Sequence, residues 1–177
     1  MNIVFLDIDG VLQPYDTDSQ FISVDNSLVR LLSKRYNTDY SKYDLSTLAS
    51  VYYDWDEQAV ARLKYALKET DSKIIVSSDW RNPDQPYKMP DLLKIHGLNS
   101  YWLEDLPLLG KGKERDDLAL IRAKEIQFAL NKHRINNFVV LDDMKAMKEY
   151  YPNNSVITYN TMSINDMNEC IRILRKK

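Results

Sequence analysis

The sequence has few of the residues on which several common classes of site depend. Its 177 residues include one cysteine, Cys170, and two histidines. An internal disulfide is therefore impossible, and a zinc site built from cysteine and histidine lacks ligands. No hydrophobic run approaches the roughly 20 residues of a membrane-spanning helix, so we expect no membrane partner. The net charge of −2 argues against non-specific binding to nucleic acid, although a local basic pocket is compatible with it.

The composition is otherwise that of a soluble globular protein. Apolar residues make up 44% of the chain and charged residues 28%, and the length suits one domain with a sizeable core. A strand begins at residue 3, with no basic segment, apolar stretch and cleavage site ahead of it. We therefore expect a cytoplasmic protein with a single domain over residues 1–177. The sequence carries no indication of oligomeric state.

Hydrophobic periodicity predicts buried strands that alternate with helices along the chain. Four short apolar runs, rich in β-branched residues, have the length of buried strands. They lie at residues 3–6, 73–77, 138–141 and 156–159. Because helical patterns separate these strands, we expect an α/β fold, a Rossmann-like three-layer sandwich around a central and mainly parallel sheet.

The helices are predicted from apolar spacing and from capping residues. One helix is expected over about 115–132, and a last helix opens at Ser163 and Asp166. Its inner face is predicted to consist of Ile164, Met167, Ile171 and Leu174. Asp54 and Glu57 resemble a capping box at the start of an earlier helix.

Residues 13–55 form a long excursion between the first strand and the helix that returns to the sheet. The first part, residues 13–25, is polar and rich in turn residues, and two short helical patterns follow. We interpret residues 13–55 as a small cap over the strand ends, without a core of its own.

Polar residues mark the ends of three of the four predicted strands. They are Asp7 and Asp9, Ser77 and Ser78, and Asp142 and Asp143. Because the carboxyl ends of parallel strands lie at one edge of a sheet, these groups are expected to meet in one crevice. Carboxylate oxygens suit Mg²⁺, and hydroxyl groups with a lysine or arginine suit a phosphoryl group. The sequence therefore predicts a magnesium and phosphate site at this edge.

These residues, in this order, resemble the motifs of the haloacid dehalogenase (HAD) superfamily of phosphotransferases across nearly the whole chain. Asp7-Ile8-Asp9-Gly10 resembles the first motif, D-x-D-G. Ser77 stands where the second motif has a serine or threonine, and Asp142-Asp143 resembles the acidic pair of the fourth. The resemblance implies a HAD-like fold and a Mg²⁺-dependent phosphatase.

The resemblance also implies a role for each acid. Asp7 would be the nucleophile that becomes an aspartyl phosphate, and Asp9 would protonate the leaving oxygen and then deprotonate water. This division is chemically reasonable, because a metal holds Asp7 ionised while Asp9 cycles its proton. Mg²⁺ would contact Asp7, the backbone carbonyl of Asp9 and Asp142, with Asp143 nearby or bound through water. Ser77 would be the catalytic hydroxyl.

The third motif is less clearly matched than the others. The superfamily has a lysine at the start of the helix before the last motif, and Lys124 lies 18 residues before Asp142. Arg122 precedes Ile126 by one turn and so shares a face with the inner apolar stripe. Lys111 and Lys113 lie in the loop just ahead. Lys124 is favoured narrowly over Arg122, and for each the alternative is a solvated charge on a helix.

The run Ser77-Ser78-Asp79-Trp80-Arg81 narrows the resemblance to a subgroup. It is similar to the HAD domains of RNA-repair (Swiss Army knife) proteins and, more distantly, to polynucleotide 3′-phosphatases. Arg81 would then clamp the substrate phosphate, together with Gly10, Ser78 and Arg122 as substrate-binding residues. The alternative for Arg81 is an ion pair with Asp79 or Asp84, with Trp80 in the core.

Two classes of function follow from these patterns. The first is a Mg²⁺-dependent phosphatase that acts through an aspartyl phosphate, on a phosphorylated small molecule or on a nucleic-acid end. A phosphotransferase or phosphomutase acting on a small metabolite has the same motifs. The second class is a catalytically silent binding module that keeps the fold. A small cap would leave a crevice open to a large substrate.

Overall fold

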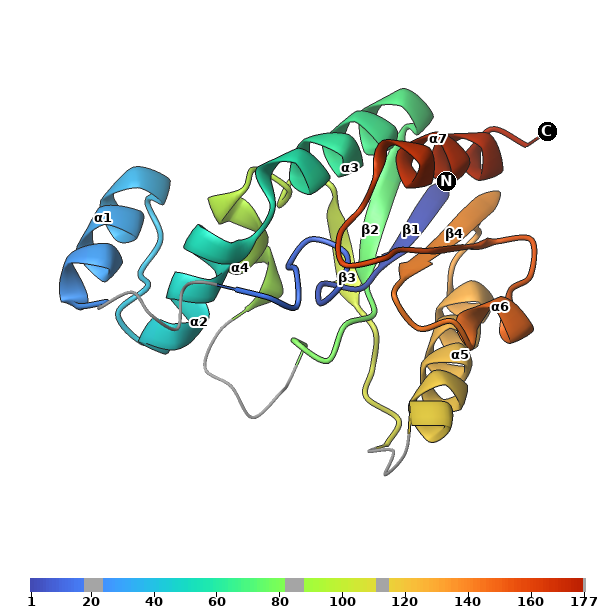
Figure 1. Cartoon of the computed structure of the whole chain (residues 1–177), viewed down its shortest axis with the longest axis horizontal. Helices are drawn as coiled ribbons and strands as arrows, with labels where there is room; N and C mark the ends of the chain where they lie inside the picture. Colours follow the sequence, from blue (N-terminus) through green and yellow to red (C-terminus); the bar gives the residue numbers. More distant parts are fainter. Residues whose placement is uncertain (18–23, 82–87, 111–114, 177) are drawn as a thin grey trace.

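The computed structural model in Figure 1 describes residues 1–17, 24–81, 88–110 and 115–176. Its elements in chain order are β1 (Asn2–Leu6), α1 (Asn26–Tyr36), α2 (Leu45–Ala49), the π-helix η2 (Ser50–Asp54), α3 (Glu57–Thr70), β2 (Ser72–Val76), α4 (Met89–Ile95), β3 (Trp102–Asp105), α5 (Arg115–Lys132), β4 (Asn137–Asp142), α6 (Met147–Tyr150), β5 (Ser155–Ile157) and α7 (Ile164–Leu174). None of the helices in these ranges is both long and apolar enough to span a bilayer.

The central sheet has five strands in the order β3-β2-β1-β4-β5, and every neighbouring pair is parallel. This arrangement confirms the predicted α/β class. The edge strand β3 was not predicted, because its four residues, Trp102–Asp105, include two acids and are only partly buried. β1 lies at the centre of the sheet. The chain adds β2 and β3 on one side of it, and then β4 and β5 on the other side.

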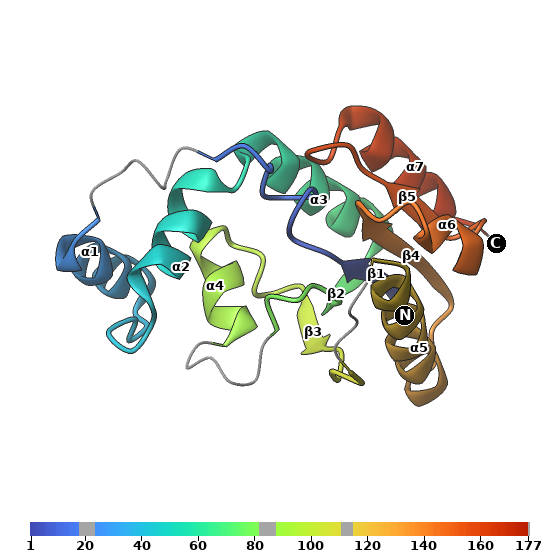
Figure 2. The same cartoon turned by 60° about the horizontal axis from the view of Figure 1, so that its bottom comes forward.

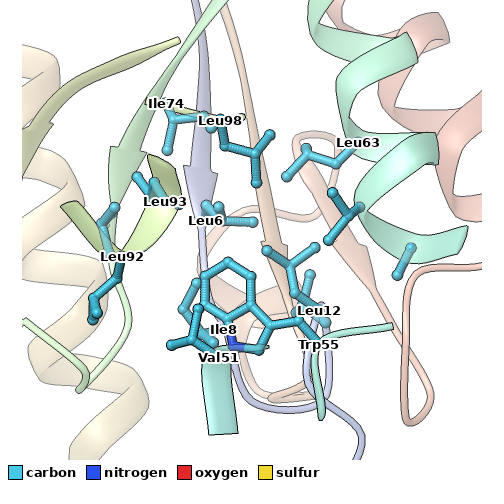
Figure 3. Close-up of a cluster of buried hydrophobic side chains, with 14 of the residues drawn as sticks. Leu6, Ile8, Leu12, Val51, Trp55, Leu63, Ile74, Leu92, Leu93 and Leu98 are labelled. Carbon is cyan, nitrogen blue, oxygen red and sulfur yellow. The ribbon is translucent and has the colours of Figure 1, made fainter. Parts of the chain in front are cut away.

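Alternation along the strands divides the core into two apolar layers. In β1, Val4 and Leu6 belong to a cluster with side chains of α3, α4 and α7, as the close-up in Figure 3 shows in part. Ile3 and Phe5 point to the other face and pack with α5 and α6. Figure 2 shows the resulting sandwich, with α3 and α7 on one side of the sheet and α5 on the other. The period of two in a strand thus buries both faces of the sheet.

The insertion at 13–55 packs against the body of the protein through its tyrosines. The hydroxyl groups of Tyr36 and Tyr40 donate to the carbonyls of Ile95 and Asp91 at the α4 helix, at 2.8 and 2.7 Å. In both views α1 and α2 lie beyond α4, on the side of the sheet away from α5 (Figures 1 and 2). Buried leucines of the insertion join the same apolar cluster as the sheet.

Capping residues explain the observed helix ends and correct two predictions. The capping box of Ser163 and Asp166 at α7 is confirmed. The N-cap of α3 is Asp56, whose carboxylate accepts from the backbone of Ala59 at 2.5 Å, so the predicted box at Asp54 is wrong. The predicted inner face of α7 is also wrong in part, because Ile164 is 58% exposed. The buried residues of α7 are Cys170, Ile173 and Leu174.

Candidate active site

The candidate site lies where the order of the sheet reverses. β1 is flanked by β2 and β4, and the three strands end together at the carboxyl edge. The backbone N–H of Asp7 donates to Leu141 at 3.0 Å, and that of Ser77 donates to Leu6 at 2.8 Å. These bonds continue the parallel register just beyond β1 and β2, and they place Asp7 between Ser77 and Asp142. Open α/β sheets bind their ligands at such a switch point.

Three carboxylates converge at this edge. Asp7, Asp142 and Asp143 each offer an oxygen within 4.8 Å of the other two. Asp142 is fully buried and Asp7 is 5% exposed. Burial, together with the negative charge of Asp7, raises the pKa of Asp142 above its ordinary value. Like charges held this close require a compensating cation or a bound proton.

Arg122 of α5 supplies part of that compensation. Its Nη1 lies 2.8 Å from Asp7 Oδ2 and 2.8 Å from Asp142 Oδ2, and its Nη2 lies 3.3 Å from Asp79 Oδ1. Burial lowers the pKa of the guanidinium, but the charges of Asp7 and Asp142 outweigh this effect and raise the pKa above its usual range. Arg122 is therefore the positive charge that the described residues place at the site.

The narrow preference for Lys124 at this position is not supported by the structure. Arg122 shares a helix face with Ala119 and Ile126, which are fully buried against the sheet. A residue two positions further along an α-helix points roughly 200° around the axis. Lys124 accordingly lies exposed on the outer face of α5. Lys111 and Lys113 lie outside the described residues.

Gly10 is required by the tight loop that follows β1. Its φ is +70°, and a Cβ there would lie 2.7 Å from the Tyr15 hydroxyl oxygen and 2.8 Å from Asp143 Cβ. The Tyr15 hydroxyl donates to the Asp143 carboxylate, and the Thr158 hydroxyl donates to the Gly10 carbonyl at 2.6 Å. Gly10 thus lets the loop pass close to Asp143, whereas a residue with a Cβ would clash there.

Asp9 occupies a different environment from Asp7. β1 ends at Leu6, so strand alternation does not extend to Asp9. The indole Nε1 of Trp80 donates to Asp9 Oδ2 at 3.0 Å. Burial and the charge of Asp7 raise the pKa of Asp9 to about 6, against the lowering effect of the Trp80 bond. A carboxyl with a pKa near neutrality is suited to giving up and taking back a proton.

Both Nη groups of Arg81 are bound to protein groups, and its Nε is buried with no hydrogen-bond partner among the described residues, so its contact with a substrate phosphate stays a prediction. Its Nη1 donates to the carbonyls of Leu106 and Pro107, at 2.9 and 3.0 Å. Its Nη2 donates to the Ser77 carbonyl at 3.1 Å and pairs with the Glu125 carboxylate. The predicted alternative, a pair with Asp79, is wrong, because Asp79 pairs with Arg122; Asp84 lies outside the described residues. Arg81 therefore ties the loops after β2 and β3 to α5.

The two serines after β2 have different surroundings. The Ser77 side-chain oxygen is buried and has no hydrogen-bond partner among the described residues. The Ser78 hydroxyl accepts a hydrogen bond from the backbone of Trp80 at 3.3 Å and so stabilises the turn. A buried hydroxyl without a partner is uncommon in folded proteins. Ser77 is thus the serine whose buried hydroxyl has its full hydrogen-bonding capacity left for a ligand.

The donor set fits Mg²⁺. Asp7, Asp142 and Asp143 offer hard carboxylate oxygens at the distances given above, which is the ligand chemistry of this ion. Asp7 and Asp142 share the single guanidinium group of Arg122 among the described residues, which leaves room for a further cation at the site. The side chain of Asp9 is not part of this group of three.

The geometry defines an α/β domain with an acidic, arginine-bridged site at its switch point. Residues 3–167 match the family described as the HAD domain in Swiss Army Knife RNA repair proteins. The match covers most of the chain, so the chain belongs to this family of HAD domains, as its motifs had indicated. Comparisons with curated proteins and with solved structures find no match. Membership supports a HAD-type phosphatase or hydrolase, a class that typically uses Mg²⁺.

Three residues around the site were not assigned to it from the sequence. Asp79 contacts Arg122, Trp80 contacts Asp9, and Glu125 pairs with Arg81. The position of Glu125 could have been predicted from spacing, since it lies one helical turn after Arg122 on the inner face of α5. Asp79 and Trp80 lie in a turn whose direction no periodicity predicts.

Proposed function

We propose that the protein is a Mg²⁺-dependent phosphoric monoester hydrolase that acts through an aspartyl phosphate on Asp7. The observation that carries this proposal is the bridge from Arg122 to Asp7 and Asp142, at 2.8 Å each, at the carboxyl edge of the sheet. It brings a carboxylate nucleophile, a further acid and a fixed cation to one point. Phosphoryl transfer depends on such positioning and charge stabilisation.

The residues divide the reaction between them. Asp7 attacks phosphorus, the bond to the leaving oxygen breaks, and Asp9 gives its proton to that oxygen. Asp9 then takes a proton from water, which attacks the phosphorus of the aspartyl phosphate and releases phosphate from Asp7. Arg122 and the Ser77 hydroxyl donate hydrogen bonds to the phosphoryl oxygens. Asp9 thus loses one proton and regains one, so the enzyme returns to its starting state.

Asp7, Asp142 and Asp143 would hold Mg²⁺. When bound, the ion supplies positive charge that offsets the carboxylates and polarises the phosphoryl group. The carboxylates themselves orient Arg122, because Asp7 and Asp142 each receive one of its hydrogen bonds. The remaining oxygens, Asp7 Oδ1 and Asp142 Oδ1, accept from backbone N–H groups at 2.9 and 2.8 Å, which fixes both side chains.

The proposed substrate is a nucleic acid or nucleotide with a terminal phosphate. The RNA-repair description of the family supports it. A second support is Tyr159, which is 93% exposed and follows Thr158, whose backbone and hydroxyl bond to Asp142 and Gly10. An exposed aromatic ring beside a phosphate site suits stacking with a base. The adjacent Asn160 accepts a hydrogen bond from the backbone of Tyr15 at 3.0 Å, which anchors this turn to the site loop.

Phosphate release from a panel of phosphoesters tests the proposal. The panel contains oligonucleotides phosphorylated at either end, nucleotides, sugar phosphates and an aryl phosphate, each with Mg²⁺ and with a chelator. We expect turnover that requires Mg²⁺ and falls below detection in Asp7→Asn, because the amide is not a competent nucleophile.

The matched control is Asp71→Asn, an equal change of charge at an exposed residue before the amino end of β2. It should retain full activity. Turnover that persists in Asp7→Asn would reject the aspartyl phosphate. No turnover on any member, with Mg²⁺ binding intact, would instead indicate a binding module. Transfer of the phosphoryl group to an added alcohol rather than to water would indicate a phosphotransferase.

A further inference from the structure

Arg122 has two kinds of acidic partner. The side chains of Asp7 and Asp142 are 7% and 0% exposed, and each lies 2.8 Å from Nη1. The side chain of Asp79 is 67% exposed and lies 3.3 Å from Nη2. The guanidinium itself is nearly buried. Of these three acidic partners of Arg122, Asp79 is therefore the one that is exposed to solvent.

A phosphate that binds at this site must compete for a cation that is already paired. Arg122 contacts three carboxylates, and the charges of Asp79 and Asp143 also act on Asp9. A phosphate monoester brings close to two further negative charges. Beyond what a bound cation offsets, each acid that stays at the site repels this phosphate, and the repulsion falls when one of the existing acids withdraws.

Asp79 is the acid that can withdraw at low cost. Asp7 and Asp142 are held by backbone N–H groups of Ile8 and Met144 and would lose buried bonds on moving. Asp79 makes the longer contact and is already largely hydrated. A surface carboxylate that leaves an ion pair regains water, so its release costs little.

We propose that Asp79 is a competing anion that occupies Nη2 of Arg122 until the phosphate of the substrate replaces it. This inference rests on the proposed phosphatase function and concerns the regulation of that site. Asp79 lowers the affinity of the site for phosphate. After hydrolysis it returns to Arg122 and helps to expel inorganic phosphate. It is a positioning and competing group rather than a catalytic residue.

Inhibition by inorganic phosphate tests this role directly. The inhibition constant is measured in the presence of Mg²⁺ for the wild type, Asp79→Asn and Asp79→Glu, and binding is confirmed by titration calorimetry without substrate. In Asp79→Asn we expect the inhibition constant to fall about fivefold or more, with a parallel fall in KM, because the neutral amide competes weakly for Arg122. Asp79→Glu, which retains the charge, should stay within about twofold of the wild type.

The control is again Asp71→Asn, which removes the same charge from the opposite end of β2. It should leave the inhibition constant unchanged, because separations beyond about 8 Å are screened at physiological salt. An Asp79→Asn protein that binds phosphate no more tightly than the wild type would overturn the inference while leaving the phosphatase proposal intact. A wild type that neither turns over nor binds phosphate would overturn the phosphatase proposal itself.

Discussion

Arg81 and Arg122 are both buried beside the same edge of the sheet, and they differ in what surrounds them. Arg81 is 8% exposed and Arg122 is 5% exposed. Arg81 donates to three backbone carbonyls and pairs with Glu125. Arg122 bonds only to carboxylates in the contacts described above, and one of them, Asp79, is exposed. The Nη groups of Arg81 are thus bound to groups of the fold, although its Nε has no hydrogen-bond partner among the described residues. Arg122 is held by carboxylates, of which the exposed Asp79 can give way to an anionic ligand.

The partners of a buried arginine indicate its role better than its burial does. A guanidinium bound to backbone carbonyls fixes the loops that carry them, because a buried carbonyl needs a hydrogen-bond donor. A guanidinium bound to clustered acids compensates charge that the fold would otherwise avoid. We therefore propose that Arg81 stabilises the fold and that Arg122 recognises phosphate, and substitution of each residue tests the two roles separately.

The largest effect is expected from Arg122→Met. The substitution removes the hydrogen-bond donors that we propose for the phosphoryl oxygens, while methionine keeps much of the side-chain volume. We expect kcat/KM to fall by about 10²–10³-fold, the usual loss for a donor to a developing charge. The measurement is steady-state kinetics at saturating Mg²⁺, with the fold confirmed by circular dichroism.

Lys124→Met is the matched control on the same helix. Lys124 is exposed, so its loss should change kcat/KM by less than about twofold. A large loss in Lys124→Met with little change in Arg122→Met would reverse the assignment of the third motif. Equal losses in both variants would mean that α5 as a whole, rather than one cation, is sensitive to substitution.

Arg81→Met is expected to act on stability instead. It leaves the Glu125 carboxylate buried without its charged partner, which costs about 3–5 kcal/mol of unfolding free energy for buried pairs. Urea denaturation measures this loss, and the activity of the folded fraction should stay within a few-fold of the wild type. The double variant Arg81→Met/Glu125→Leu should recover only the part of the loss that comes from the unpaired carboxylate, because the carbonyls of Leu106, Pro107 and Ser77 still lack their donor. A stable Arg81→Met protein that has lost phosphate affinity would contradict the assignment.

The positions of the acids could be predicted because strand geometry controls them. Continuous apolar runs mark buried parallel strands, and the residues that follow such strands must meet at one edge. Asp7, Ser77 and Asp142 are placed in this way. The last helix was found from its capping box, which is a local signal.

The partners of the arginines could not be predicted because they depend on tertiary packing. Lys124 and Arg122 are two residues apart, and the rotation of α5 about its axis decides which one faces the sheet. The hydrophobic pattern of α5 is weakly amphipathic, since Leu120 and Phe128 are exposed. Glu125 is charged yet 1% exposed, which composition alone argues against. Its burial is made possible by the ion pair with Arg81, which lies more than forty positions away in the sequence.

His96 is a partly buried base whose hydrogen bond also goes to a backbone carbonyl, and its substitution has the smallest expected effect. Its ring stacks on Trp55 at 5.1 Å with 13° between planes, and Nε2 donates to the Val51 carbonyl at 2.6 Å. Burial lowers the pKa of His96 below its ordinary value of 6.5. The unfolded chain therefore binds a proton more readily than the folded one, so His96 contributes stability above pH 6.5 that is lost as the pH falls through and below that value.

His96→Gln removes this titration while its amide can still donate to the Val51 carbonyl. We expect the variant to lose less unfolding free energy than the wild type between pH 7.5 and pH 5, measured by urea denaturation at each pH. Other titrating groups are common to both proteins and cancel in the difference. Identical losses in the two proteins would mean that His96 gains its proton without cost. A histidine bonded to a carbonyl would then tolerate charge in the same way as Arg81, and the type of partner would no longer distinguish a partly buried neutral base from a buried cation.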